Sequence, residues 1–145
     1  MKALVKKKEK DGSVFYLIQW SSITKADKYD IVRKIPSIPG IYELYYMDEK
    51  KKLNLFFFSR AYYGGLRNHI RKTTDAELET DLKRREILQK YDCYYRYSET
   101  ASFADMSDIL YFFSKTYFPD RDFEHSGRYL DIFVNEVSDD KIVTI

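Results

Sequence analysis

The stretch 40–59, GIYELYYMDEKKKLNLFFFS, decides the fold of this chain. Apolar and aromatic residues dominate 40–46 and 52–59, and such residues favour the half-buried pleated surface of a strand. The residues between the two runs, 47–51, are mostly charged and suit an exposed turn. We therefore expect an antiparallel hairpin at the centre of the fold.

The residues after this hairpin predict helices around one more strand. Residues 61–72 place Tyr62, Leu66 and Ile70 at helical spacing, which indicates a short basic helix. A longer helix is expected from residue 74 or 75 to about 91, with a Glu79 to Lys83 pair on its surface. Residues 93–97, CYYRY, are typical of a strand. A helix over 102–117 should follow, because Ser102 has an acid three residues later, as in a capping box.

The flanking sequence adds strands at both ends. Residues 13–20, SVFYLIQW, predict a strand, and the lysines before them are expected to form a solvated tail. Residues 21–34 suit either a short helix or a loop, before Pro36 and Pro39 end any helix. Residues 129–137 and 142–145 are strand-like.

This order predicts a single α+β domain over 1–145, with a mixed arrangement of strands and helices. We expect a small, mainly antiparallel central sheet flanked by about three helices. Its core should span about 35–119, extended by an N-terminal strand segment, 13–34, and a C-terminal strand pair, 129–145.

Composition excludes several classes of protein. Of the 145 residues, 44% are hydrophobic and 17% aromatic, too many for a disordered chain. No apolar run approaches the ~20 residues that span a bilayer, and the charged N-terminus does not resemble a signal peptide, so we expect no membrane association and a cytoplasmic protein. The single cysteine, Cys93, cannot form an internal disulfide and is expected to fill the core.

Charge is unevenly distributed along the sequence. Residues 1–72 hold 16 Lys and Arg against 7 Asp and Glu, whereas residues 73–145 hold 9 against 16. Such an asymmetry suits a basic face turned toward phosphates, provided that the two halves of the sequence also occupy different sides of the molecule.

Three short motifs follow one another between residues 35 and 70. Residues 35–42 read IPSIPGIY, in which a proline-bearing lead precedes Gly-Ile-Tyr. Residues 57–61 read FFSRA at the end of the next expected strand, and residues 65–70 read GLRNHI in the expected helix after it. In this order the motifs resemble GIY-YIG nuclease domains, whose second motif is Tyr-Ile/Val-Gly before a basic residue and Ala, and whose helix begins Asn-Leu-Arg-x-Arg. The resemblance covers 35–119 and implies the same order of strands and helices.

The resemblance implies a site that cleaves phosphodiesters. In that family, tyrosines position or activate water, a helix Arg contacts the phosphate and a Glu holds one divalent metal, so Mg²⁺ or Mn²⁺ is the only cofactor implied, and only for an active nuclease. By position, Tyr42 matches the first motif's Tyr, His69 the catalytic Arg and Asp108 the metal-binding Glu. Asp105 is the second candidate for the metal ligand.

Several residues depart from the family's chemistry. Phe57 replaces the second motif's Tyr and cannot transfer a proton, and Ser59 replaces its Gly. His69 lacks the bidentate fork of Arg. Asp108 is shorter than Glu and falls almost opposite the helix's apolar stripe, where a solvated side chain is expected. We therefore predict a catalytically inactive domain that binds nucleic acid or a protein partner.

Other readings of these motifs stay open. The triplet Tyr62-Tyr63-Gly64 could act as the second motif, and Arg67 or Arg71 could supply the guanidinium. A divergent metal-dependent DNA endonuclease is thus an alternative, which leaves the question of an enzyme undecided. A purely structural or partner-binding domain with a tyrosine-rich interface is another.

One basic segment is the candidate surface for DNA or RNA. Its cations would contact phosphates and its tyrosine would stack on bases. The simpler interpretation is a solvated helix flank whose aromatic residues pack in the core. The candidate residues are Arg60, Tyr62, Arg67, Arg71 and Lys72.

Overall fold

The predicted hairpin is the centre of a five-stranded sheet. The computed structural model describes residues 2–121, 123–138 and 142–143. In it, β4 (Gly40–Met47) pairs antiparallel with β5 (Leu53–Ala61) and, on its other edge, with β6 (Asp92–Glu99). The strand order is β5-β4-β6-β3-β8, with β3 (Ile23–Lys25) antiparallel to β6 and β8 (Ile142–Val143) parallel to β3.

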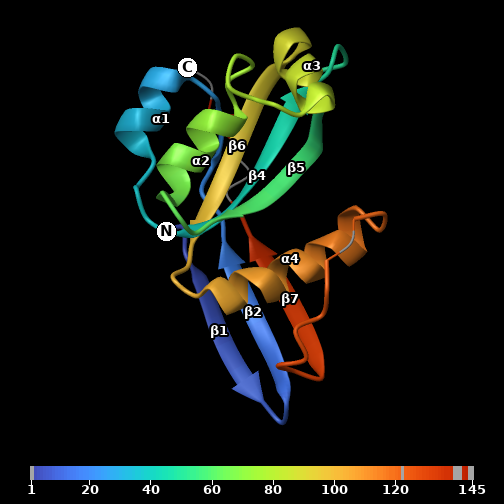
Figure 1. Cartoon of the computed structure of the whole chain (residues 1–145). Helices are drawn as coiled ribbons and strands as arrows, with labels where there is room; N and C mark the ends of the chain where they lie inside the picture. The colour runs from blue at the N-terminus through green and yellow to red at the C-terminus, as the bar shows by residue number, and fades with distance from the viewer. Residues whose placement is uncertain (1, 122, 139–141, 144–145) are drawn as a thin grey trace.

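Three helices cover one face of this sheet (Figure 1). They are α1 (Lys28–Lys34), α2 (Gly65–Thr73) and α3 (Leu82–Lys90). Asp27 caps α1 by accepting from two backbone N–H groups, so the segment 21–34 is a short strand followed by a helix. Cys93 lies in the core beneath the helices, as predicted, with the following residues: Ile31, Ile35, Tyr42, Leu44, Ala61, Leu66, Ile70 and Tyr95.

The expected long helix over residues 74 or 75 to 91 is wrong in its first half. α3 begins only at Leu82, with Asp81 as its cap. Before it, Asp75 Oδ1 accepts from Glu77 N, and the buried carboxylate of Glu79 accepts from Asp81 N, 2.9 Å away in both cases. These local side-chain bonds to the backbone stabilise turns in place of the helix.

Three of the flanking strands form a second sheet beside the predicted central one, whereas β3 and β8 extend the central sheet. β2 (Ser13–Gln19) pairs antiparallel with β1 (Val5–Lys10) and parallel with β7 (Asp131–Val137). The N-terminal lysines are therefore an edge strand and not a solvated tail. Their charge concealed the strand from the sequence pattern, and charge on an edge strand discourages pairing with further chains.

Helix α4 (Phe103–Tyr117) lies between the two sheets, crossing β2 and β7 in Figure 1. Ser102 caps it by accepting from Asp105 N at 3.1 Å, as predicted. The core around α4 combines side chains of the helix with side chains from both sheets. Its buried members are Val14, Tyr16, Ile18, Trp20, Ile41, Phe58, Met106, Ile109, Leu110 and Phe113. The fold is α+β, as the sequence predicted. Within the described residues, no helix is both long and apolar enough to cross a membrane.

Candidate functional site

Tyr42 and His69, two residues of the predicted catalytic set, do lie together. Tyr42 projects from β4 toward α2, and its ring centroid is 6.4 Å from that of His69 and 6.1 Å from that of Phe57. The side chains meet because α2 packs across the face of β4 that carries Tyr42. However, Tyr42 is only 1% exposed, so a phosphate in solvent cannot reach its hydroxyl.

The Tyr42 hydroxyl is enclosed within the core. The nearby polar side chains are those of Thr73, at the end of α2, and Ser59, on the neighbouring strand. Burial raises the pKa of Tyr42 to about 12, because the phenolate would lose its hydration. The phenol is therefore protonated at neutral pH, and the buried side chain suits a structural role better than that of a general base.

His69 holds the loop that leads into α2. Its Nε2 lies 2.7 Å from the backbone oxygen of Tyr63, and because a carbonyl only accepts, Nε2 carries the proton. The bond spans Gly64, whose φ of +84° is a left-handed conformation that suits glycine. His69 thus fixes the turn before the helix, a role that the sequence comparison did not suggest.

A partly buried ion pair lies beside this cluster and was missed from the sequence. Arg84 contacts Glu79 through two hydrogen bonds, Nε to Oε2 at 3.2 Å and Nη2 to Oε1 at 3.1 Å. Its guanidinium also lies 4.2 Å from the ring centre of Phe57. The predicted Glu79 to Lys83 helix pair does not arise, because Glu79 precedes the helix. No local sequence signal marks this pair, since its position depends on the turn at 75–81.

The predicted metal ligand Asp108 belongs to the other side of the five-stranded sheet. Along β4, Ile41 packs with α4 whereas Tyr42 packs with α2, as expected from the alternation of side chains on a strand. Asp108, on α4, is fully buried. The prediction of a solvated Asp108 is therefore wrong, because the second sheet and residues 126–128 cover the side of α4 that the apolar stripe leaves free.

Asp108 and Asp105 are both occupied by partners within the chain. The Tyr16 hydroxyl lies 3.1 Å from Asp108 Oδ2 and 3.0 Å from Asp105 Oδ1, and Arg128 spans the two carboxylates at 2.9 and 3.2 Å. Lys7 adds a contact to Asp105 at 3.2 Å. Burial and the two carboxylates raise the pKa of Tyr16. The described residues contain no cluster of three or more His, Cys, Asp or Glu that could hold a metal.

Three of the predicted nucleic-acid residues make contacts within the protein. The Arg60 guanidinium lies 4.4 Å from the ring centre of Phe103 and donates to Ser107 Oγ at 3.1 Å. Tyr62 packs edge-on against the same phenyl ring. Arg67 donates from Nε to the backbone oxygen of Ile35 at 2.7 Å, which ties α2 to the end of α1.

The two remaining residues, Arg71 and Lys72, are exposed on α2, and Arg71 borders a groove. The groove lies between α1 and α2, has a volume of about 440 Å³ and is lined by Lys28, Tyr29, Val32, Arg33 and Arg71. Tyr29 is 71% exposed. The groove thus combines three cations and an open aromatic ring. Its α1 side was not among the predicted binding residues, because the sequence pattern left open whether residues 21–34 form a short helix or a loop.

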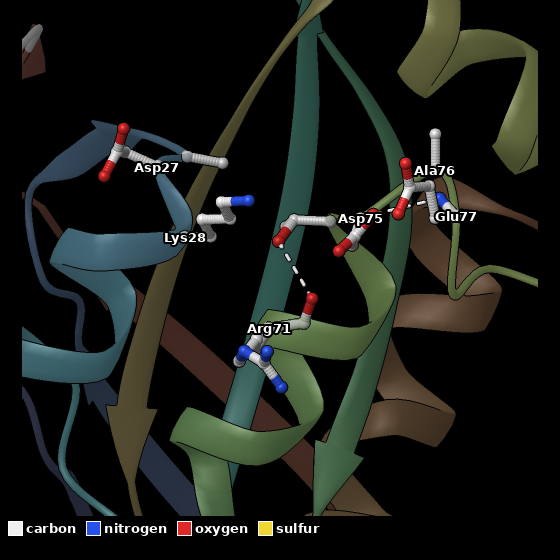
Figure 2. Close-up of a pocket in the computed structure, with 8 residues that line it drawn as sticks. Asp27, Lys28, Arg71, Asp75, Ala76 and Glu77 are labelled. Carbon is white, nitrogen blue, oxygen red and sulfur yellow. Dashed lines mark hydrogen bonds between the residues drawn. The ribbon is translucent and has the colours of Figure 1, made fainter.

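A second hollow continues from this groove past Lys28 and Arg71. Figure 2 shows Lys28 at the start of α1, Arg71 on α2, and Asp75 and Glu77 on the turn that follows α2. The hollow has a volume of about 430 Å³. Acidic side chains therefore border one end of the region, and the cations around Tyr29 border the other.

The helices that cover this face carry a strong excess of positive charge. α1 reads KYDIVRK, α2 reads GLRNHIRKT and α3 reads LKRREILQK, so basic residues far outnumber acidic ones in all three. α4, on the opposite side of the sheet, instead contributes two buried aspartates. The charge asymmetry of the sequence therefore partly becomes an asymmetry between the two sides of the sheet.

Comparison with known proteins places the chain in one sequence family. Neither the curated proteins nor the solved structures gave a match. A family model with the description "Uncharacterised protein" matches residues 4–145, which is nearly the whole sequence, and the chain therefore belongs to that family.

Proposed function

We propose that this chain is a GIY-YIG-like domain that binds nucleic acid through its α1 and α2 surface without cleaving it. The order β4, β5, α2, α3, β6 and α4 agrees with the order of elements that the sequence motifs imply. Gly40 of the PGIY motif supports an architectural role, because a Cβ there would collide with the backbone oxygen of Ser98 and lie 2.7 Å from Leu66. The motif glycine is needed where α2 crosses β4.

The placement of the candidate catalytic groups argues against cleavage. General acid–base chemistry requires groups that reach one phosphate together. Tyr42 is buried beneath α2, whereas Asp105 and Asp108 lie on the other side of the sheet, bound to Tyr16 and Arg128. The first turn of α2 is also closed to phosphate, because the backbone oxygens of residues 36 and 38 accept from its N–H groups.

The groove beside Tyr29 is the observation that carries the binding proposal. Three cations, Lys28, Arg33 and Arg71, surround an exposed tyrosine, and no acidic residue is among the described residues that line this groove. Cations neutralise phosphates and release counterions, while an exposed aromatic ring offers a surface for a base. The excess of basic residues on α1, α2 and α3 extends the same potential over the neighbouring surface.

Fluorescence anisotropy tests this proposal directly. A labelled 20-bp duplex and a labelled 20-nucleotide strand would be titrated with the full chain at 50 and 200 mM KCl. We expect binding that weakens steeply with salt, and a loss of about tenfold or more in duplex affinity in the double variant Arg33→Glu/Arg71→Glu. Lys115→Glu on α4 is the matched charge reversal. No binding at 50 mM KCl, or an equal loss in both variants, would disprove the proposal.

The alternative of a divergent endonuclease rests on one observation. Tyr42, His69, Glu79 and Arg84 gather on the same side of the sheet and supply the residue types that the resemblance implies. Such a site would have to open, because Tyr42 and Glu79 are both buried. Metal-dependent cleavage that is lost in both Tyr42→Phe and Glu79→Gln would favour this alternative over the binding proposal.

A further inference from the structure

The three-stranded sheet has one covered face and one open face. Val14, Tyr16 and Ile18 of β2 are buried against α4. Because side chains alternate along a strand, Phe15 and Leu17 point to the opposite face. In Figure 1, α4 lies over one side of this sheet only. We call the other side the outer face, formed by Lys6, Lys8, Lys10, Ser13, Phe15, Leu17, Gln19, Asp131, Phe133, Asn135 and Val137.

Two phenylalanines form an aromatic platform on the outer face. Phe15 and Phe133 are partners in the parallel register of β2 and β7, and their ring centroids lie 4.9 Å apart with an interplanar angle of 14°. Their exposed fractions are 38% and 46%. Phe has no polar atom that would favour solvent, so this pair, with Leu17 and Val137 on the same face, forms an exposed apolar surface with an aromatic centre.

A row of lysines runs beside this platform. The antiparallel register places Lys8 next to Phe15, Lys6 next to Leu17 and Lys10 next to Ser13, so the three lysines share the outer face. All three are exposed, and none has an ion pair within the part of the chain that the structure describes. Lys7, the lysine that points inward, is by contrast paired with Asp105. The outer row therefore has positive charge that the protein does not neutralise.

We propose that the outer face binds single-stranded nucleic acid. The lysine row would contact the phosphates, and unstacked bases would lie on Phe15 and Phe133. Stacking of bases on exposed aromatic side chains of a sheet, combined with cations along the backbone, is a general mode of single-strand recognition. A duplex cannot use the platform, because its bases are already stacked on one another.

This site is separate from the groove of the proposed function. The outer face belongs to β1, β2 and β7, whereas the groove lies between α1 and α2 on the five-stranded sheet. Since they share no residue, substitutions in one leave the other intact. The two proposals can therefore fail independently.

The test compares two substitutions of the aromatic pair in the full chain. Phe15→Leu/Phe133→Leu keeps an apolar surface of similar size but removes the rings, and Phe15→Tyr/Phe133→Tyr keeps the rings. Fluorescein-labelled rU20, dT20 and a 20-bp duplex would be titrated by anisotropy at 50 mM KCl. We expect the Leu pair to weaken binding of single strands by about tenfold and the Tyr pair to retain it. Duplex affinity should not change.

The lysine row is tested by salt dependence. In Lys6→Ala/Lys8→Ala/Lys10→Ala, the slope of log affinity against log salt for dT20 should decrease by about two, near 0.7 for each phosphate that a lysine no longer neutralises. Lys115→Ala should leave the slope unchanged. The relative affinities for rU20 and dT20 show whether the site prefers RNA or DNA.

Several results would overturn the proposal. Equal affinity in the Leu pair and the unmodified chain would show that base stacking is absent. Sedimentation velocity showing a dimer that the Leu pair dissociates would assign the face to a second copy of the chain. Binding to phosphatidylserine vesicles, without binding to either oligonucleotide, would assign it to a membrane surface.

One further result would support the outer face as an independent site. In Arg33→Glu/Arg71→Glu, duplex binding would then be lost while dT20 binding is retained.

Discussion

Arg128 lies with its Nη1 2.9 Å from Oδ2 of the buried Asp108, across 20 positions of sequence. The same guanidinium reaches Asp105 through Nη2 at 3.2 Å. A residue in the segment between α4 and β7 therefore bridges two carboxylates of α4, and Lys7 supplies a second cation to Asp105. These ion pairs stabilise the fold, because burying a carboxylate that has no partner costs much free energy.

Removing this guanidinium should destabilise the fold. We expect Arg128→Ala to lower the free energy of unfolding by about 1–2 kcal/mol, because Asp108 loses its cation while Tyr16 and Ser126 still donate to it. Urea denaturation followed by circular dichroism measures the change. Lys115→Ala, which removes an exposed cation from α4, should change stability by less than about 0.5 kcal/mol. Equal stability of Arg128→Ala and the unmodified chain would contradict the prediction.

The glycine of the PGIY motif should be intolerant of any side chain. Gly40→Ala would bring a Cβ against the backbone of Ser98, which cannot move without disturbing β6. We expect a loss of about 2–3 kcal/mol in unfolding free energy. In Gly127→Ala the Cβ meets no atom within 4 Å, and only the positive φ opposes it, so a loss of about 1 kcal/mol is expected. The reverse order of the two variants would show that the close packing of Gly40 is not limiting.

Tyr42 should control part of the alkaline stability. Its folded-state pKa of about 12 lies above the ordinary value of 10, so its contribution is fully present below about pH 10 and is lost as the pH rises from 10 toward 12. Tyr42→Phe should cost about 1 kcal/mol at pH 7, because the buried hydroxyl that lies near Ser59 and Thr73 is removed. Its stability should then decline less steeply above pH 10. Urea midpoints at pH 7, 10 and 11 measure both effects.

The matched control for this measurement is Tyr29→Phe, since Tyr29 is exposed on α1. Its midpoints should follow those of the unmodified chain across the same pH range. Identical alkaline slopes for Tyr42→Phe and Tyr29→Phe would contradict the assigned role of burial.

Incubation with a divalent metal should not make the chain a nuclease. We expect supercoiled plasmid to remain uncut after incubation with the purified chain and millimolar Mg²⁺ or Mn²⁺. The physical reason is that Tyr42 is buried and the α4 carboxylates are bound by Arg128 and Tyr16. Gel electrophoresis gives the result. Cleavage that disappears in Tyr42→Phe would refute the inactive-domain proposal.

Local patterns in the sequence were sufficient for much of the secondary structure. The hairpin of β4 and β5, the strand β2 and the helix capped by Ser102 follow from apolar runs, a charged turn and a capping residue close to one another in the chain. The α+β class follows from their order. Each of these features depends on interactions between residues close together in the chain, and the local order of residue types reflects such interactions.

The tertiary structure alone decided which side chains meet. The lysine-rich segment 5–10 is a strand because β2 offers it a partner edge, and Asp108 is buried because that second sheet closes over α4. Tyr42 and Asp108 both match positions of one catalytic site in the motif order of the sequence. In the structure, however, they lie on opposite sides of a sheet. The physical reason is that burial and pairing depend on contacts between segments far apart in the chain, whereas propensity depends only on neighbours.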